Sequence, residues 1–425
     1  MAGTQGRPVL IVFYDLGAAG SAEILSAARG GYEVVFACDR TSPYVAQRFD
    51  ALSRYATVMD VTGLAPAAVA TALAARGPSG AVTFSESRLG FTAEVALAAG
   101  LPFHHPDVVA VLTDKHAQRA ALRAAGVDGT RCRVVRHGAE LAGALAEVGL
   151  PAVVKPRRGG AASRDTYLVH DAAQATDLLT DLLDGGLDGG LDGELDGELV
   201  VEEYLVGDPG AAGEFWGDRV SVESLVVDGR VHPVGVTGKF ALAPPLRETG
   251  QFAPCTLAPE AAAEAERLAE RAVLALGVRH GATHTELKLT AAGPRVIEVN
   301  GRLGGNLGDL LRRGAGFDIL RATMDVAAGA TPRLPSPRGR RTLAYQRYLA
   351  PPMRQATLVT AGELDRLRRL PGVRRVEEHA RPGAALDWRR GTEECLAVVY
   401  GEARNHDELR ATVEAIDAAF QPVYA

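Results

Sequence analysis

The sequence has few cysteines and no long hydrophobic run, and each absence excludes a class of protein. Its four cysteines, Cys38, Cys132, Cys255 and Cys395, lie far apart and form no CxxC pair. A disulfide framework is therefore not expected, and the thiols are predicted to be free in a reducing compartment. The apolar run in PVLIVFY near the N-terminus is too short for a signal peptide or for the ~18 apolar residues of a membrane span. We therefore expect a cytoplasmic protein that contacts no membrane.

An excess of basic residues is also absent. The formal net charge is −6, which argues against nucleic acid as the main partner. Hydrophobic residues make up 47% of the chain and charged residues 23%, as in folded proteins. Because the 425 residues exceed the usual size of one hydrophobic core, we expect two to four domains.

Familiar nucleotide, metal and nucleophile signatures are missing as well. DLGAAGSAE, after the first apolar run, lacks the G-x-G-x-x-G spacing, and Asp39 is a weak acidic companion, so an ordinary turn is favoured over a dinucleotide site. The repeat at 184–198, DGGLDGGLDGELDGE, does not have EF-hand spacing and is interpreted as an acidic surface loop. No catalytic triad is recognisable.

The chain does contain a regular alternation of strands and helices. PVLIVFY, YEVVFACD and AVTFSE are interpreted as strands separated by helices, which predicts a parallel α/β sheet. A helix capped near Thr113 or Asp114 follows, then strands flanking a helix at 139–148. Two hairpins are predicted to turn at VDGR and AAGP. The arginine-rich stretch TPRLPSPRGRR is interpreted as a linker to a small α+β domain.

The stretch RVIEVNGRLGGN, residues 295–306, carries the most specific chemistry. Strand alternation places Glu298 and Asn300 on one face and directs Ile297 and Val299 into the core. If this strand pairs with HTELKL, Glu286 converges with Glu298. Two carboxylates and a carboxamide suit Mg²⁺, whereas unpaired carboxylates side by side repel each other.

The alternative for this face is a solvated surface whose charges are balanced by Lys288 and Arg302. Arg302 follows the strand directly, where a guanidinium can pair with a phosphate or a developing anion. Lys155 ends the strand PAVVK and precedes the loop PRRGGAAS, a setting that suits phosphates although it is not a P-loop. Taken alone, Lys115 would be a surface lysine.

Taken together and in order, Lys115, VVKPRRGGAAS, VVEEYLVG, SVE, TELKL and VIEVNGRLGG resemble the ATP-grasp ligases over about residues 7 to 330. The resemblance implies a multidomain α/β and α+β ATP-grasp fold. Its expected parts are an N-terminal parallel α/β domain (1–112), a lid subdomain with its preceding helix (113–207), a subdomain with the metal site (208–330) and a C-terminal α+β domain (331–425).

The same resemblance implies ATP between two sheets, with Mg²⁺, or alternatively Mn²⁺, on Glu286, Glu298 and Asn300. The glycine-rich loop after Lys155 would close over the phosphates. The adenine edge would be formed by the Glu202 side chain and the backbone of Glu203 and Leu205. The full set of expected nucleotide-binding residues is Lys115, Lys155, Gly159, Gly160, Ser163, Glu202, Glu203, Tyr204, Leu205 and Lys288.

Within this family the layout looks most like the L-amino-acid ligases. That similarity implies an enzyme that forms an acyl phosphate on one amino acid, joins it to a second amino acid or amine, and releases ADP and phosphate. Arg302 and Lys239 are the expected catalytic cations. The expected substrate residues are Glu223, Glu248, Gln251, Gly304, Gly305 and Asn306.

One position departs from the subgroup. Relatives carry a histidine three residues after the glutamate that corresponds to Glu248, but this chain has Gln251, whose amide cannot take up a proton at neutral pH. The identity of the substrate pair therefore stays open. Glu248 is read as an anchor for a substrate ammonium or as an exposed loop carboxylate, and Glu223 as a ligand contact or a structural partner.

Two rival functions remain at this stage. A biotin-carboxylase-like or purine-pathway enzyme would activate bicarbonate or formate, although the chain has no biotinyl-lysine segment of the MKM kind. A non-catalytic ATP-binding protein is disfavoured by the complete set of lysines and metal ligands. The expected partners are small molecules, and a homodimer is left open.

Overall fold

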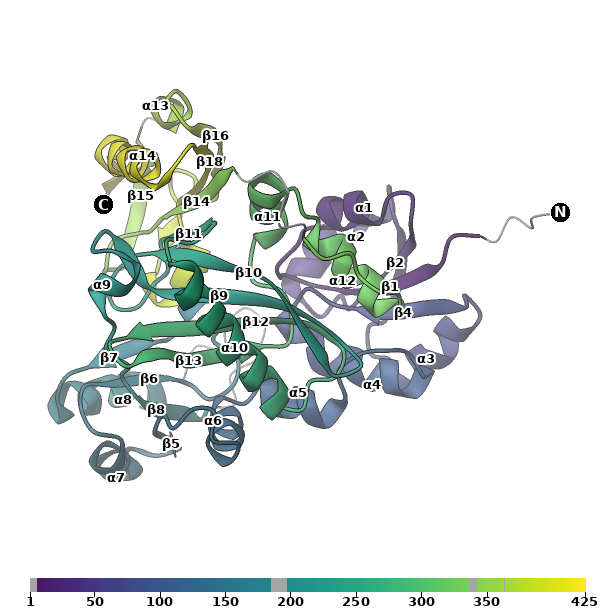
Figure 1. The fold of residues 1–425 in the computed structure, drawn as a ribbon, viewed down its shortest axis with the longest axis horizontal. Helices are drawn as coiled ribbons and strands as arrows, with labels where there is room; N and C mark the ends of the chain where they lie inside the picture. The colour runs from purple at the N-terminus through teal and green to yellow at the C-terminus, as the bar shows by residue number, and fades with distance from the viewer. Residues whose placement is uncertain (1–5, 185–196, 336–341, 363) are drawn as a thin grey trace.

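The computed structural model describes residues 6–184, 197–335, 342–362 and 364–425. Most of the low-complexity repeat at 184–198 and the second half of the predicted linker lie outside these residues. The described chain forms a parallel sheet near the N-terminus, a small antiparallel sheet, a large antiparallel sheet, and a short three-stranded sheet near the C-terminus (Figure 1).

The parallel sheet has the strand order β3-β2-β1-β4. Strand β1 (Val9–Tyr14) is almost entirely buried, because helices cover both faces of such a sheet. The other elements are α1 (Ser21–Ala28), β2 (Glu33–Cys38), α2 (Pro43–Ser53), β3 (Thr57–Asp60), α3 (Pro66–Ala74), β4 (Pro78–Val82), η1 (Glu86–Arg88), α4 (Leu89–Ala99) and α5 (Pro106–Leu112). Strand β3 and the helices beside it were not predicted; β3 has no fully buried residue and only four residues.

Helix α6 (Lys115–Ala124) connects the parallel sheet to the small sheet. Its N-cap is Asp114, whose side chain accepts hydrogen bonds from the backbone N–H groups of His116 and Ala117, as the sequence predicted. The small sheet has the order β5-β8-β6-β7. Its elements are β5 (Cys132–Val135), α7 (Gly138–Val148), β6 (Ala152–Pro156), η2 (Ala161–Ser163), β7 (Tyr167–Val169), α8 (Ala172–Asp184) and β8 (Leu199–Glu203).

The large sheet has eight strands in the order β13-β12-β9-β10-β11-β14-β18-β16, all paired antiparallel. Both predicted hairpins are confirmed, with β9 and β10 joined at VDGR and β12 and β13 joined in AAGP. Its first part contains α9 (Pro209–Ala212), β9 (Trp216–Val227), β10 (Arg230–Phe240), β11 (Gly250–Ala253), α10 (Pro259–Ala275), β12 (Gly281–Thr290), β13 (Gly293–Asn300), α11 (Leu307–Ala315) and α12 (Ile319–Ala327).

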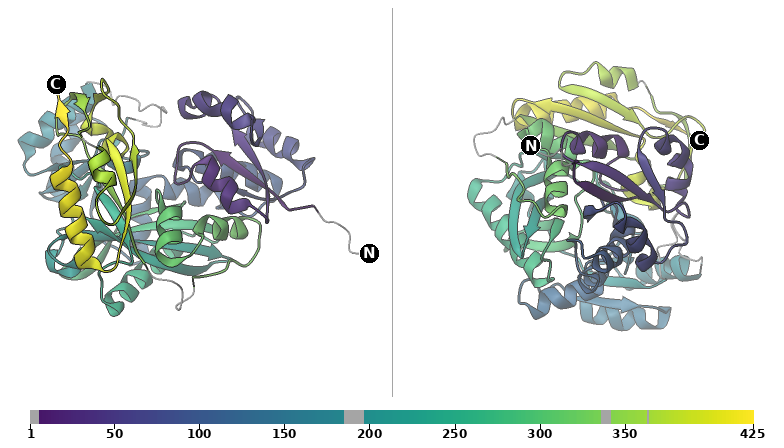
Figure 2. Two further views of the ribbon diagram at one scale, coloured as in Figure 1. Left: turned by 90° about the horizontal axis from the view of Figure 1, so that it is seen from above. Right: turned by 90° about the vertical axis from the view of Figure 1, so that its right-hand side faces the viewer.

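The C-terminal strands extend this same sheet, because β14 pairs with β11. The elements are β14 (Leu343–Leu349), β15 (Ala356–Thr360), α13 (Leu364–Arg368), β16 (Val373–Glu378), β17 (Ala385–Leu386), η3 (Trp388–Glu394), β18 (Ala397–Ala403), α14 (His406–Ala419) and β19 (Val423–Tyr424). In the left view of Figure 2 these elements lie at one end of the molecule and the parallel sheet lies at the other. The domain boundaries expected from the sequence remain predictions.

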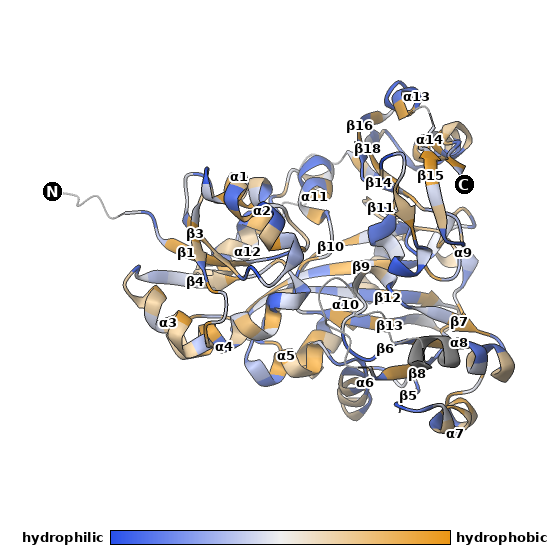
Figure 3. Cartoon of the chain, turned by 180° about the vertical axis from the view of Figure 1, so that it is seen from behind, coloured by the Kyte–Doolittle hydropathy of each residue, from blue (hydrophilic) through white to orange (hydrophobic). Residues whose placement is uncertain are grey.

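Hydrophobic side chains are distributed as this layout requires. The β1 strand is coloured mainly as hydrophobic in Figure 3, whereas α13 carries hydrophilic turns. Helix α10 packs against β10 and β13 and covers one face of the large sheet, which leaves the opposite face of these strands for polar residues. Within the described ranges, no helix is long and apolar enough to cross a membrane. The four cysteines are free thiols, as predicted.

Candidate functional site

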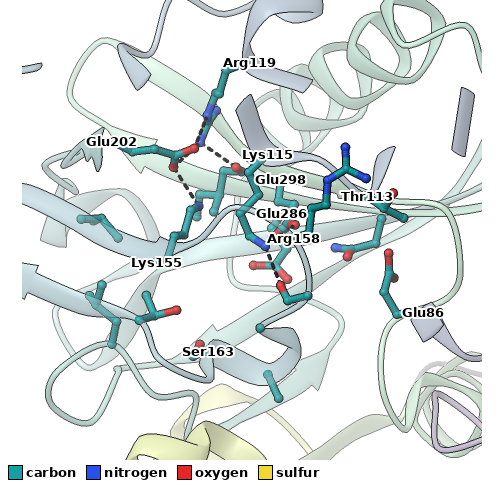
Figure 4. Close-up of a pocket in the computed structure, with 18 of the residues that line it drawn as sticks. Glu86, Thr113, Lys115, Arg119, Lys155, Arg158, Ser163, Glu202, Glu286 and Glu298 are labelled. Atoms are coloured by element: carbon teal, nitrogen blue, oxygen red, sulfur yellow. Dashed lines mark hydrogen bonds and ion pairs between the residues drawn. The ribbon is translucent and has the colours of Figure 1, made fainter. Parts of the chain in front are cut away.

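A cavity of about 400 Å³ lies between the small sheet and the polar face of the large sheet. Figure 4 shows side chains from both sheets and from helix α6 pointing into it. The parallel sheet contributes Glu86, which lies in η1 just beyond the carboxyl end of β4. Three of the four sheets thus supply side chains to one site.

The predicted carboxylate pair is formed in the β12–β13 hairpin. Glu286 is the register partner of Glu298, and His284 is the partner of Asn300. The side chains of Glu286 and Glu298 are 25% and 24% exposed, and both line the cavity together with Asn300. Among the described residues no cluster of three or more His, Cys, Asp or Glu could hold a metal by itself. The donors present fit Mg²⁺, which uses one or two carboxylates and completes its shell with substrate oxygens and water.

One expectation for this strand is wrong. Ile297 does not point into the core but lines the cavity, while Val296 and Val299 are fully buried. The reason is a register shift between Glu286 and Leu287, whose partner is Val296, so that Ile297 is the extra residue of a β-bulge. A bulge interrupts the two-residue alternation on which the prediction depended.

His284 fixes the Glu286 carboxylate from behind. Its Nδ1 is hydrogen-bonded to Glu223, and its Nε2 lies 3.4 Å from Glu286 Oε1. Burial alone would lower the pKa of His284, but the charges and hydrogen bonds of Glu223 and Glu286 raise it to about 9. Burial would likewise raise the pKa of Glu286, yet His284 and the charges of Lys239 and Arg219 hold it well below its usual range. Glu286 is therefore an ionised oxygen donor at neutral pH.

The small sheet and helix α6 supply cations opposite these carboxylates. Lys115 Nζ donates to the Gly159 carbonyl at 2.7 Å and lies 3.8 Å from Glu298 Oε1. Lys155 Nζ lies 2.8 Å from Glu202 Oε2, and Arg119 Nε lies 3.1 Å from Glu202 Oε1 (Figure 4). Burial alone would raise the pKa of Glu202, but the charges and hydrogen bonds of Arg119 and Lys155 lower it to about 2.

The loop after Lys155 has an unusual backbone. Gly159, Gly160, Ala162 and Ser163 all have positive φ angles, between 59° and 71°. Glycine adopts this conformation readily, whereas alanine and serine do so at a cost. The loop is also held by the C-terminal region, because the Asp165 N–H donates to the Arg389 carbonyl at 3.0 Å. The loop after Lys155 thus lines the cavity and contacts η3, and its predicted role in binding phosphates remains a prediction.

A further wall of the cavity comes from β9 and the loop after β10. Arg219, Leu242, Leu246 and Glu248 line it. Arg219 Nη1 lies 3.6 Å from Glu248 Oε1, and Lys239 Nζ lies 3.4 Å from the same oxygen. The loop carboxylate is therefore shared by two cations, at distances longer than normal hydrogen bonds.

The structure brings most of the predicted site residues to this cavity. Of the predicted site residues, those that line the cavity are Lys115, Lys155, Gly159, Gly160, Ser163, Glu202, Glu203, Tyr204, Leu205, Glu248, Glu286, Lys288, Glu298, Asn300 and Arg302. The remaining candidates, which do not line it, are Glu223, Lys239, Gln251, Gly304, Gly305 and Asn306. Their predicted roles as substrate or catalytic residues remain predictions.

These remaining candidates form a layer of hydrogen bonds behind the wall. Gln251 accepts from Lys239 Nζ at 3.1 Å and donates to the Gly305 carbonyl at 2.8 Å. Glu223 accepts from the Gly304 N–H at 3.2 Å. The layer therefore ties the glycine-rich turn after β13 to strands β9–β11.

Sequence reasoning missed several cavity residues, and three charged ones among them had a signal in the sequence. Glu86 follows the carboxyl end of a parallel strand, where ligands bind in such sheets; its carboxylate lies 3.0 Å from Arg302 Nε, and burial raises its pKa. Arg119 is four residues after Lys115, on the same helix face. Arg219 alternates with Ser221 and Glu223 along one strand face.

Comparison with known proteins adds independent findings. No family model matches the sequence. The chain is 30% identical over 354 residues to the uncharacterized protein y4rH of Sinorhizobium fredii, covering 81% of this chain and 69% of that protein. It is 30% identical over 313 residues to mouse carnosine synthase 1, covering 68% of this chain. It is 28% identical over 219 residues to the alanine–anticapsin ligase of Bacillus subtilis, covering 50% of this chain. These matches span only 36% of the carnosine synthase and 46% of the anticapsin ligase.

Solved structures share the fold. The L-amino acid ligase from Bacillus licheniformis superposes with a TM-score of 0.78 over 100% of both chains, at 19% identity. The biotin carboxylase domain of the Hydrogenobacter thermophilus 2-oxoglutarate carboxylase, solved with MgADP, superposes with a TM-score of 0.64 at 16% identity, over 98% of this chain and 90% of that one. The chain therefore belongs to the ATP-grasp ligases, a family of enzymes, and it is similar to the L-amino-acid ligases of that family.

Proposed function

We propose that the protein is an ATP-dependent carboxylate–amine ligase that joins an amino acid to a second amino acid or amine. One observation carries the proposal. The carboxylates of Glu286 and Glu298, which suit a metal, line the same cavity as Lys115, Lys155 and Arg302, which suit phosphate groups.

Nucleotide would lie between the two sheets. Tyr204 and Leu205, which follow β8 directly, and Ile297 give this part of the cavity apolar surface for a purine ring. The Glu202 carboxylate is ionised and can only accept hydrogen bonds. Together with the backbone of Glu203 and Leu205, in the same segment, it suits the polar edge of the adenine ring. Lys115 and the positive-φ loop would face the phosphates.

Magnesium held by Glu286, Glu298 and Asn300 would neutralise charge on the phosphates during transfer. The carboxylate oxygen of the first substrate attacks the γ-phosphorus of ATP, the bond to the β–γ bridging oxygen breaks, and ADP leaves. The amine nitrogen of the second substrate then attacks the acyl carbon, inorganic phosphate departs, and the nitrogen loses a proton. Little covalent help from the protein is required.

Arg302 is the residue suited to the developing oxyanion. It follows β13 directly and lines the cavity with its guanidinium 3.0 Å from Glu86. A fixed cation aimed at developing charge stabilises the tetrahedral species more than the ground state. Glu86 would keep the guanidinium oriented and offers a carboxylate to a substrate ammonium.

The proposal is tested by phosphate and ADP release with ATP and magnesium against amino acids, singly and in pairs. Hydroxylamine in parallel reactions traps an acyl phosphate as a hydroxamate. The expected result is a hydroxamate from one amino acid and faster ADP release when a second amine is added. Bicarbonate-dependent ADP release without any amino acid would instead support a carboxylase, and no hydroxamate with any acid would contradict the proposal.

A further inference from the structure

The cavity wall formed by β9 and the loop after β10 contains buried polar atoms with no hydrogen-bond partner. Arg219 is 8% exposed, and its Nε and Nη2 have no partner among the described residues. Glu248 Oε1 is likewise buried and has no hydrogen-bond partner among these residues. Buried donors and acceptors without partners cost stability, and they are rare in folded proteins unless a ligand or water satisfies them.

Two lysines, Lys288 and Lys239, lie near Arg219 and have acidic partners of their own. Lys288, its register partner on β12, is paired with Asp218 at 2.6 Å. Arg219 and the buried Lys239 share Glu248, at 3.6 and 3.4 Å, and their charges also act on the Glu286 carboxylate. The Nε and Nη2 groups of Arg219 nevertheless have no hydrogen-bond partner among the described residues, and buried charged donors of this kind suit an anionic ligand group.

From this geometry we propose that Arg219 binds the free carboxylate of the amine-bearing substrate, so that the acceptor is an amino acid and not a simple amine. The inference rests on the proposed ligase function. The unpartnered Nε and Nη2 of a guanidinium form a fork that matches both oxygens of a carboxylate. Glu248 Oε1, beside it, accepts no hydrogen bond within the described residues, although two cations lie at 3.4 and 3.6 Å, and it suits the amine N–H of the same molecule.

The position of Arg219 suits the binding of the acceptor amino acid. It lies on β9, the strand beside β12, two residues along from Ser221, which is the register partner of the metal-ligand candidate Glu286. Neighbouring strands are about 4.8 Å apart. A carboxylate held by Arg219 thus leaves the amine of a small amino acid close to the place where the acyl phosphate would form. The phosphate-facing lysines, Lys115 and Lys155, come from α6 and the small sheet.

The experiment compares two acceptors for one activated acid, namely the donor that gives a hydroxamate in the wild type. Hydroxylamine carries no carboxylate, whereas the second amino acid carries one. In Arg219→Gln, the ratio of amide-product rate to hydroxamate rate should fall about 10- to 100-fold, the value of a charged hydrogen-bond pair. The KM for the acceptor amino acid should rise by a similar factor, and Arg219→Lys should recover part of the loss.

Matched acceptors sharpen the same test. The wild type should prefer an amino acid over its carboxamide, and Arg219→Gln should lose most of this preference. Arg133→Gln is the control, because Arg133 is 51% exposed and does not line the cavity; it should match the wild type.

The outcomes separate the two proposals. A rise in the KM for ATP with no change in the acceptor ratio would assign Arg219 to a nucleotide phosphate and overturn the inference. Equal use of amino acids and their carboxamides by the wild type would overturn it as well. A wild type that forms no hydroxamate would instead contradict the ligase function itself, and this inference would fall with it.

Discussion

The two sheets that enclose the cavity differ in how their charged side chains are paired. On the small sheet, Glu202 has both carboxylate oxygens occupied, one by Arg119 and the other by Arg119 and Lys155. On the large sheet, the Glu286 and Glu298 carboxylates face each other, and Arg219 has guanidinium nitrogens without partners. In the first arrangement both carboxylate oxygens already have partners within the protein. In the second, the partly exposed carboxylates and the guanidinium keep atoms that are available to a metal and to charged substrates.

If this contrast holds, removing a large-sheet carboxylate should abolish turnover. Glu298→Ala should lower the rate of ADP release by about 1,000-fold or more, because several kcal/mol of metal stabilisation in the transition state would be lost. Raising the magnesium concentration should restore part of the rate. The measurement is ADP release against magnesium concentration, with Glu260→Ala as a control because Glu260 is an exposed residue of α10.

Full turnover in Glu298→Ala at ordinary magnesium would exclude this residue from the metal site. The thermal stability of the metal-free variant gives a second readout. It should not fall below that of the wild type, because the substitution removes repulsion between Glu286 and Glu298.

On the small sheet, the largest effect should be on stability. Glu202→Gln should lower the free energy of unfolding by about 3 kcal/mol, since it leaves two buried cations without their counter-charge. Its neighbour provides a matched control: Glu203 pairs with Arg131, which is 53% exposed, so Glu203→Gln should cost less than about 1 kcal/mol. Urea denaturation of both variants makes the comparison. Equal losses would mean that the Glu202 cluster is no more structural than a surface ion pair.

The same carboxylate should contribute to stability in a defined pH range. The folded pKa of Glu202, about 2, is below that of an unfolded glutamate, about 4.3, so its contribution is present above pH ~4.3 and is lost as the pH falls toward 2. When the pH falls from 6 to 3.5, this group should lower the free energy of unfolding of the wild type by about 1 kcal/mol. Unfolding measured at both pH values should show that Glu202→Gln lacks this part of the loss; an identical loss in both proteins would contradict the assignment.

The sequence could predict contacts between residues that are close in the chain better than contacts between distant segments. The two-residue period of HTELKL and VIEVN was enough to place Glu286 and Glu298 near each other in one hairpin, but the register of its short turn alone would put Ile297 opposite Glu286. The bulge at Ile297 could not be predicted, because it depends on how β13 pairs with its neighbour and not on residue type.

Contacts between distant segments were also beyond the reach of the sequence. Glu86 reaches Arg302 only because η1 is placed against the end of β13. The pairing of β11 with β14, which joins the C-terminal strands to the large sheet, brings together residues about 100 positions apart. Alternation could have placed Arg219 on the polar face, but not its lack of partners. That depends on Lys239 and Lys288, which come from other strands and pair with Glu248 and Asp218.

The smallest effect should come from the buried arginine of the large sheet. Arg119 and Arg219 are both buried and both line the cavity, with exposures of 5% and 8%. Arg119 donates to both Glu202 oxygens and to the carbonyls of Val296 and Ile297, so Arg119→Met should cost about 3 kcal/mol or more. Arg219→Met should change the free energy of unfolding by less than about 1 kcal/mol, because methionine fills the space and leaves no hydrogen-bonded partner behind.

Urea denaturation of the two methionine variants without ligand is the direct measurement. A large loss in Arg219→Met would show that the guanidinium serves the fold, as Arg119 does, and that the two sheets do not differ in the way their charges are paired. A small loss would mean that the protein keeps a buried guanidinium that its own stability does not need. In that case the selection for Arg219 has to come from what the cavity binds.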